Sequence, residues 1–324
     1  MIKIVKGLFC YVKNFFLAFY PRYDYSAYTS MEFVFDKGGN MKLKYILCAT
    51  ALVMSLPALA DDEGGKWTLN LREVSLSYSN TTVGNAEEYQ DSPISQFSMD
   101  SQYNIIGKFD ALLDNEQEDG LWRTNLLLNY GKVKIKPVNE PADTTESADK
   151  IWLSTEYAFK TWNAYDTDIG PFGQIAFQTE FTANQDAPRY KVISGREGIK
   201  AFEGEYVKEL YVAAVEEYDF TYSNARTTKY GWEVGTRLEY PLREGVKFTA
   251  TGRYTDYLHY SRYVATDLEY DLDVTAKMEV SMTDTISLAP YISYRRGEAR
   301  GANKAGDNFV IGLSLKYADL FNLN

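Results

Sequence analysis

The sequence predicts an all-β protein: a single transmembrane antiparallel β-barrel of about twelve strands, with ten as the alternative. Hydrophobic and polar residues alternate with period two in long runs between residues 61 and 324, as expected for strands whose two faces meet different surroundings. No segment after residue 60 has the about 20 consecutive apolar residues that a transmembrane helix needs. A bacterial secretory signal at 41–60 indicates that the mature chain is exported.

Run length decides between a membrane barrel and the alternative, a soluble β-sandwich or lipocalin-like barrel. The run 267–282 carries apolar side chains at its even positions and mostly charged side chains at its odd positions. Strands in soluble proteins average about 5–6 residues, whereas a tilted membrane-spanning strand needs about 9–11. Similar runs recur at 229–240 and 307–318, and this recurrence favours the membrane barrel.

The alternation divides residues 61–324 into individual strands. The segment 190–203 has the weakest pattern, because Gly195 and Gly198 interrupt it, and losing it together with a neighbour would leave ten strands. The predicted strands are 66–79, 95–110, 120–135, 149–161, 170–183, 190–203, 207–223, 229–240, 246–260, 266–282, 286–296 and 307–318.

The connections between these strands alternate in length, as they do in outer-membrane barrels with short periplasmic turns and long outer loops. The connections 241–245 and 283–285 are short and are predicted to be periplasmic. The connections 111–119 and 162–169 are intermediate. The long connections, predicted to be external, are 80–94, 136–148 and 297–306.

The first 60 residues divide into two parts. A signal peptide occupies 41–60, with a lysine-containing start, an apolar stretch at 46–56 and an A-x-A cleavage site at 58–60. The Lys-Gly-Gly sequence just before Met41 corresponds to the codons of a ribosome-binding site. We therefore interpret Met41 as the true start and residues 1–40 as a mis-annotated leader, rather than as an extension of the protein.

Composition excludes several kinds of chemistry. Both cysteines, Cys10 and Cys48, precede residue 61, so the mature chain cannot form disulfides or thiolate metal sites. His259 is the only histidine, which excludes a multi-histidine metal site. The net charge of −11 is unfavourable for binding nucleic acid. We expect no cofactor and no metal.

The last predicted strand carries Gly312 followed by the alternating apolar residues Leu315 and Tyr317. This pattern resembles the insertion signal of Gram-negative outer-membrane β-barrel proteins, although the chain continues to Asn324 beyond its final strand aromatic. The resemblance implies residence in the outer membrane and recognition by the barrel-assembly machinery. It also implies contact with outer-membrane lipid and lipopolysaccharide, which divalent cations could bridge to acidic residues of the external loops.

The charged positions of the alternating runs are candidates for lining the lumen. An acidic stripe on one run requires cations, water or basic neighbours, because its carboxylates repel one another. Either the charges form a network that fills the lumen, or they line a polar pore that favours cations. The predicted pore-lining residues are Asp267, Glu269, Asp271, Asp273, Arg253, Arg237, Arg295 and Glu233.

One pair of residues suggests an alternative function. His259 and Ser261 have the H-x-S spacing of some outer-membrane lipid hydrolases, in which the histidine acts as base for the serine. The apolar phase of Leu258 and Tyr260 predicts instead that His259 faces the lumen as an ordinary polar residue. We therefore expect a small passive channel for polar or cationic solutes, with a lipid hydrolase or a closed structural or surface-binding barrel as alternatives.

Overall fold

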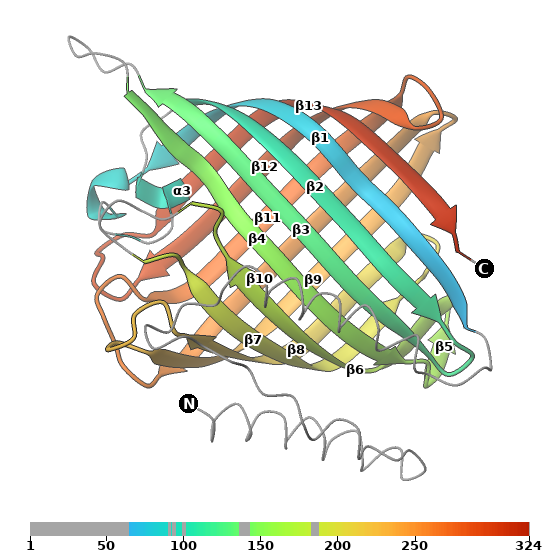
Figure 1. The fold of residues 1–324 in the computed structure, drawn as a ribbon, viewed down its shortest axis with the longest axis horizontal. Helices are drawn as coiled ribbons and strands as arrows, with labels where there is room; N and C mark the ends of the chain where they lie inside the picture. The colour runs from blue at the N-terminus through green and yellow to red at the C-terminus, as the bar shows by residue number, and fades with distance from the viewer. Residues whose placement is uncertain are drawn as a thin grey trace. The chain divides into compact units, whose positions relative to one another are not determined.

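A computed structural model describes residues 65–89, 92, 95–98, 102–135, 143–182 and 188–323. These residues form a closed antiparallel β-barrel of 12 strands with one extra short strand (Figure 1), which confirms the predicted fold class. Within these ranges no helix has the length and apolar character needed to cross a membrane. The predicted leader at 1–40 and signal peptide at 41–60 lie outside the described residues.

The barrel strands are between 12 and 19 residues long, which is enough to cross a bilayer at a tilt. They are β1 (Lys66–Gly84), β2 (Gln102–Glu116), β3 (Gly120–Ile135), β4 (Asp143–Phe159), β6 (Thr167–Thr179), β7 (Lys191–Phe202), β8 (Val207–Asp219), β9 (Thr227–Arg243), β10 (Val246–Tyr260), β11 (Leu268–Ser281), β12 (Ile286–Ala299) and β13 (Gly306–Asn322). The remaining elements are η3 (Ala86–Tyr89), α3 (Ser95–Ser98) and β5 (Trp162–Ala164).

Each strand pairs with its neighbours in the chain, and two further pairings close the barrel and bypass β5. β1 pairs with β13, and β4 pairs with β6. Closure leaves no barrel strand with an unpaired edge in the bilayer, where an unsatisfied backbone group is costly. The weakest predicted strand, 190–203, is present as β7. The prediction for 95–110 began too early, because residues 95–98 form the short helix α3.

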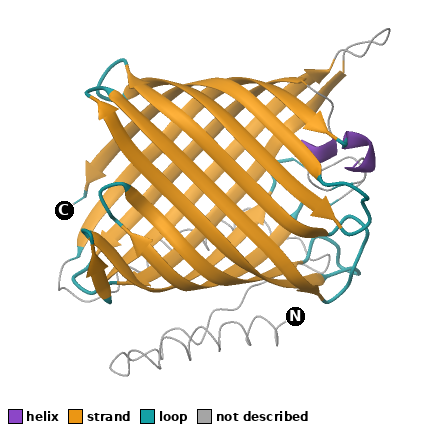
Figure 2. Ribbon diagram, turned by 180° about the vertical axis from the view of Figure 1, so that it is seen from behind, coloured by secondary structure: helices purple, strands orange, loops and turns teal. Residues whose placement is uncertain are grey.

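The two ends of the barrel differ in their connections, which Figure 2 shows as teal segments. Short turns at 117–119, 203–206, 244–245 and 282–285 join strands at one end, and the longer loops lie at the other. By the usual arrangement of such barrels, the short turns are periplasmic. The intermediate connection 162–169 contains the hairpin of β5 with β6, whose turn places Tyr165 and Asp166 at positive φ.

The distribution of polarity is inverted relative to a soluble protein. On β1, the alternating residues Leu76 and Tyr78 are 61% and 55% exposed on the outside, whereas Ser77 and Ser79 are buried inside the barrel. Exposed apolar residues recur on the outer surface of β1, β2 and β7 to β13, for example Ile311 and Leu313 on β13. An apolar outside and a polar inside indicate a barrel whose outer surface contacts lipid.

Two lumenal glycines allow tyrosine rings to lie against the barrel wall. A Cβ atom at Gly312 would lie 2.4 Å from the Tyr291 ring, and one at Gly235 would lie 2.3 Å from the Tyr211 ring. Each tyrosine is directly opposite its glycine on the neighbouring strand, an arrangement in which an aromatic side chain covers a strand glycine. Gly312 of the predicted insertion signal therefore also serves the packing of the lumen.

We predict that Gly235→Ala destabilises the barrel by about 1–3 kcal/mol, because the added methyl group displaces a packed ring. Gly173→Ala is the matched control, since a Cβ there meets nothing within 4 Å. The measurement is the urea midpoint of unfolding, followed by tryptophan fluorescence in detergent micelles. Equal midpoints for the two variants would contradict the role assigned to Gly235.

Candidate functional site

The lumen contains six of the eight predicted pore-lining residues, and Asp271 is paired with arginines on both neighbouring strands. Its carboxylate accepts hydrogen bonds from Arg295 Nε and Nη2, both at 2.8 Å, and lies 3.5 Å from Arg253 Nη2. Asp273 is directly opposite Arg253 on one neighbouring strand and Arg295 on the other. The acidic stripe of β11 is therefore partnered by arginines rather than left as free negative charge.

The other two predicted residues, Asp267 and Glu269, do not continue this lumenal stripe. A β-bulge lies between Leu268 and Tyr270 and shifts the register by one residue. As a result Leu268 points inward and is 7% exposed, while Glu269 lies at the rim, 3.6 Å from Arg300. Asp267 precedes the strand and accepts a hydrogen bond from the Val264 amide. Burial raises the pKa of Asp267 above its usual value.

A second bulge changes the prediction for His259. The register of β10 against β9 shifts between Tyr257 and His259, so Tyr260 rather than His259 faces the lumen. His259 is exposed and stacks on the outward-facing Tyr230, with ring centroids 6.3 Å apart. The expectation of a lumenal histidine is wrong, because an alternation count cannot detect an inserted residue.

The proposed hydrolase pair is not joined in the described structure. His259 Nδ1 lies 3.3 Å from Tyr263 Oη. Ser261 Oγ accepts a hydrogen bond from the Thr228 amide at 2.9 Å. Both side chains therefore have partners other than each other, and the structure does not support a lipid hydrolase built on this pair.

Glu233 is the centre of a buried hydrogen-bond network in the lumen. It is 1% exposed and accepts from Arg196 Nε at 2.7 Å, Tyr211 Oη at 2.6 Å and Thr255 Oγ1 at 2.8 Å. Arg196 lies on β7, where Gly195 and Gly198 interrupt the alternation and obscure its inward direction. Ser194, Arg196 and Lys200 share one face of β7, and this shared phase is the signal in the sequence that predicts the inward direction of Arg196.

A lumenal tryptophan lies close to two cations near this network. Lys150 Nζ is 4.8 Å from the centre of the Trp152 ring, and the Arg196 guanidinium is 5.4 Å from it. Both distances are within the range of cation–π attraction. Within the described ranges, no group of three or more His, Cys, Asp or Glu side chains is placed to hold a metal ion.

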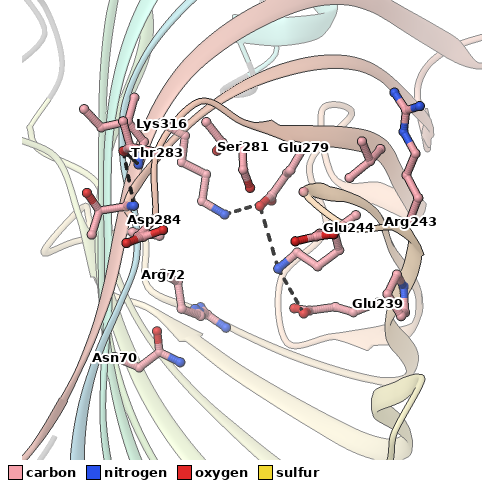
Figure 3. A pocket seen from close by; sticks show the side chains of 18 of the residues that line it. Asn70, Arg72, Glu239, Arg243, Glu244, Glu279, Ser281, Thr283, Asp284 and Lys316 are labelled. Atoms are coloured by element: carbon pink, nitrogen blue, oxygen red, sulfur yellow. Dashed lines mark hydrogen bonds and ion pairs between the residues drawn. The ribbon is translucent and has the colours of Figure 1, made fainter.

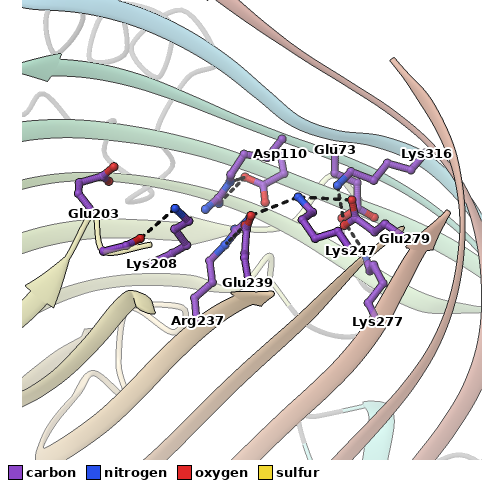
Figure 4. A network of polar contacts seen from close by, with 12 residues as sticks. Glu73, Asp110, Glu203, Lys208, Arg237, Glu239, Lys247, Lys277, Glu279 and Lys316 are labelled. Atoms are coloured by element: carbon purple, nitrogen blue, oxygen red, sulfur yellow. Dashed lines mark hydrogen bonds and ion pairs between the residues drawn. The ribbon is translucent and has the colours of Figure 1, made fainter. Parts of the chain in front are cut away.

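Towards the periplasmic end, a network of ion pairs extends around β1, β2, β9, β10, β11 and β13 (Figure 4). In this network each carboxylate contacts two cations. For example, Glu73 Oε2 lies 3.1 Å from Lys108 Nζ and 2.9 Å from Lys277 Nζ. The other carboxylates with their pairs of cations are Asp110 with Arg72 and Lys108, Glu239 with Arg237 and Lys247, and Glu279 with Lys247 and Lys316.

A cavity of about 570 Å³ occupies the periplasmic mouth beside this network. Arg72, Glu239, Glu279 and Lys316 line it, together with the turns at 244–245 and 283–285 (Figure 3). Because its walls carry charged and hydroxyl side chains, the cavity is suited to water and polar solutes. Among the basic residues that line this cavity, only Arg237 belongs to the predicted pore-lining set.

At the opposite, external mouth, the short helices η3 and α3 pack against the inside of the barrel wall. Tyr89 and Phe97 are 2% and 0% exposed and pack together with Leu268. The paired glycines Gly297 and Gly306 leave the space that the Phe97 ring occupies, since a Cβ atom at either would lie 3.1 Å from that ring. The packed loop narrows the external mouth.

These features define the class of the protein. A closed antiparallel barrel with an apolar outer surface and a charged lumen is an outer-membrane β-barrel, as the last strand predicted. No protein-family model matches the sequence, and no curated protein matches it.

Several solved structures share the barrel architecture. An outer membrane channel from Pseudomonas putida F1 is 14% identical, with 80% of this chain and 97% of that chain covered and a TM-score of 0.45. The outer membrane channel DcaP of Acinetobacter baumannii is 10% identical over 80% of this chain and 99% of its own, with a TM-score of 0.40. The translocator domain of the autotransporter NalP from Neisseria meningitidis is 10% identical over 85% and 95%, with a TM-score of 0.36. These are similarities of fold alone.

We predict that Glu233→Gln destabilises the barrel by about 3 kcal/mol, because the buried Arg196 cation then lacks its counter-charge. Glu269→Gln serves as the control, since the Glu269 side chain is 51% exposed and its pair with Arg300 is long; an exposed pair contributes less than about 1 kcal/mol. Urea midpoints for the two variants check the prediction. A Glu233→Gln barrel as stable as the control would show that the network is dispensable.

Proposed function

We propose that the protein is a small passive channel for polar solutes across the outer membrane. The observation that carries the proposal is the polar and ionic lining of the lumen, which extends from the Glu233 network to the 570 Å³ cavity at the periplasmic mouth. A barrel of this strand number lies between side-chain-filled barrels of about eight strands and open porins of about sixteen. A narrow polar path is consistent with that size.

The proposal does not include the preference for cations that the acidic stripe suggested. That preference required unpaired carboxylates, whereas Asp271 is bridged by Arg295 and Arg253. Glu269 lies at the rim beside Arg300. After these pairings, the charges of the lumen taken together favour neither a strongly cationic nor a strongly anionic solute.

One observation favours a second candidate, a closed barrel that acts through its external surface. Tyr89 and Phe97 fill part of the external mouth, and Tyr89 Oη is hydrogen-bonded to the carbonyl oxygens of Gly297 and Lys304 at 3.1 and 2.8 Å. A loop held in this way obstructs passage unless solutes pass beside it.

Conductance in a planar bilayer distinguishes the two candidates. We expect small, stable unitary steps in KCl from the protein purified from outer membranes. Phe97→Ala, which removes the buried ring from the mouth, should increase the step size by about twofold or more, because the pore widens where it is narrow. Heat-modifiable migration on a gel verifies that each barrel is folded. Silence from both folded proteins would reject the channel and support the closed barrel.

A further inference from the structure

A second group of lumenal ion pairs lies on the remaining strands, from β2 to β8, and its pattern of sharing is reversed. One of its carboxylates, Glu203, is labelled in Figure 4 beside the first network. Here each cation contacts two carboxylates. Arg123 Nη2 lies 2.9 Å from Asp114 and 2.8 Å from Glu203. The other two cations with their pairs of carboxylates are Lys200 with Glu156 and Glu209, and Lys160 with Glu116 and Asp168.

The two groups therefore have opposite excess charge. In the first network, which we call the basic arc, the cations Arg72, Lys108, Arg237, Lys247, Lys277 and Lys316 outnumber the carboxylates Glu73, Asp110, Glu239 and Glu279. In the second group, the acidic arc, the carboxylates Asp114, Glu116, Glu156, Asp168, Glu203 and Glu209 outnumber the cations Arg123, Lys160 and Lys200.

By strand order, the arcs occupy opposite halves of the barrel wall. The basic arc follows the contiguous strands from β9 through β13 and β1 to the middle of β2, and the acidic arc follows the periplasmic end of β2 and the strands from β3 to β8. At one boundary Glu209 is directly opposite Arg237 on the neighbouring strand.

The side chains that carry the excess charge are accessible to a solute. On the basic arc, Lys108 and Lys247 are 31% and 39% exposed, and Lys247 lines the cavity. On the acidic arc, Glu203 and Glu209 are 43% and 27% exposed. Their more buried partners, such as Lys200, are already compensated, so a solute meets positive charge on one side and negative charge on the other.

We propose that the two arcs form a constriction with a transverse electric field that selects zwitterionic solutes of the size of an amino acid; this rests on the channel function proposed above. A zwitterion places its carboxylate toward the basic arc and its ammonium toward the acidic arc, and both ends are stabilised. An uncharged solute gains no such energy, and a simple ion is attracted by one arc and repelled by the other.

Liposome swelling with two isomeric probes tests the inference. L-Serine is zwitterionic, whereas its isomer glyceramide is uncharged, so their comparison removes differences in composition. After subtraction of protein-free liposomes, we expect serine to enter about tenfold faster than glyceramide through the wild-type protein, the lower end of what focused fields achieve. The ratio should fall as salt is added, since about 1 M salt shortens the screening length to about 3 Å.

Two double variants each remove two charges from one arc while leaving every partner one ion pair. In Lys108→Gln/Lys247→Gln, the carboxylate of Glu73 retains Lys277 and that of Glu279 retains Lys316. In Glu203→Gln/Glu209→Gln, the cation of Lys200 retains Glu156 and that of Arg123 retains Asp114.

Either double variant should bring the serine-to-glyceramide ratio near one. The control Glu269→Gln/Arg300→Gln removes a pair at the external rim and should leave the ratio unchanged. Equal rates for the two probes in the wild-type protein, with KCl conductance intact, would overturn the zwitterion inference while leaving the channel. A ratio retained in both arc variants would overturn it as well. Absence of both swelling and conductance from folded protein would reject the channel and this inference together.

Discussion

Pairing of charges inside the barrel is the constraint on which the rest of the structure depends. Closing the strands into a tube of this size brings many ionised side chains into a confined space, and an unpaired buried charge costs several kcal/mol. The buried charge of Glu233 is compensated by hydrogen bonds from Arg196, Tyr211 and Thr255, and that of Asp271 by ion pairs with two arginines. Nearest neighbours in the sheet do not suffice, because Arg196 and Glu233 are two strands apart. The network therefore links strands that are not hydrogen-bonded to each other through their backbones.

Sharing of partners gives the lumen its electrical character. A carboxylate placed between two cations, such as Glu73 between Lys108 and Lys277, leaves local positive charge. A cation placed between two carboxylates, such as Arg123 between Asp114 and Glu203, leaves local negative charge. The net charge of the whole chain does not reveal this arrangement, because the excess positive charge and the excess negative charge lie on opposite walls of the lumen.

The external end of the barrel is shaped by small departures from regular geometry. The bulge at 269 turns Leu268 inward, where it packs with Tyr89 and Phe97. The glycine pair Gly297 and Gly306 leaves the space in which the two rings lie. The inserted residue in β11 and the absence of a Cβ atom at the two glycines therefore allow the rings of Tyr89 and Phe97 to occupy part of the external mouth.

Residue alternation by itself determined the class of fold, the number of strands and the inward direction of Asp271, Arg253 and Glu233, because side chains on a strand alternate faces. Tertiary structure alone decided where that alternation breaks, and so turned His259 outward. It also decided which charges meet across the lumen and where the first loop rests. These outcomes depend on contacts between residues far apart in the chain, such as Lys277 with Glu73, and no local pattern in the sequence encodes such a distance.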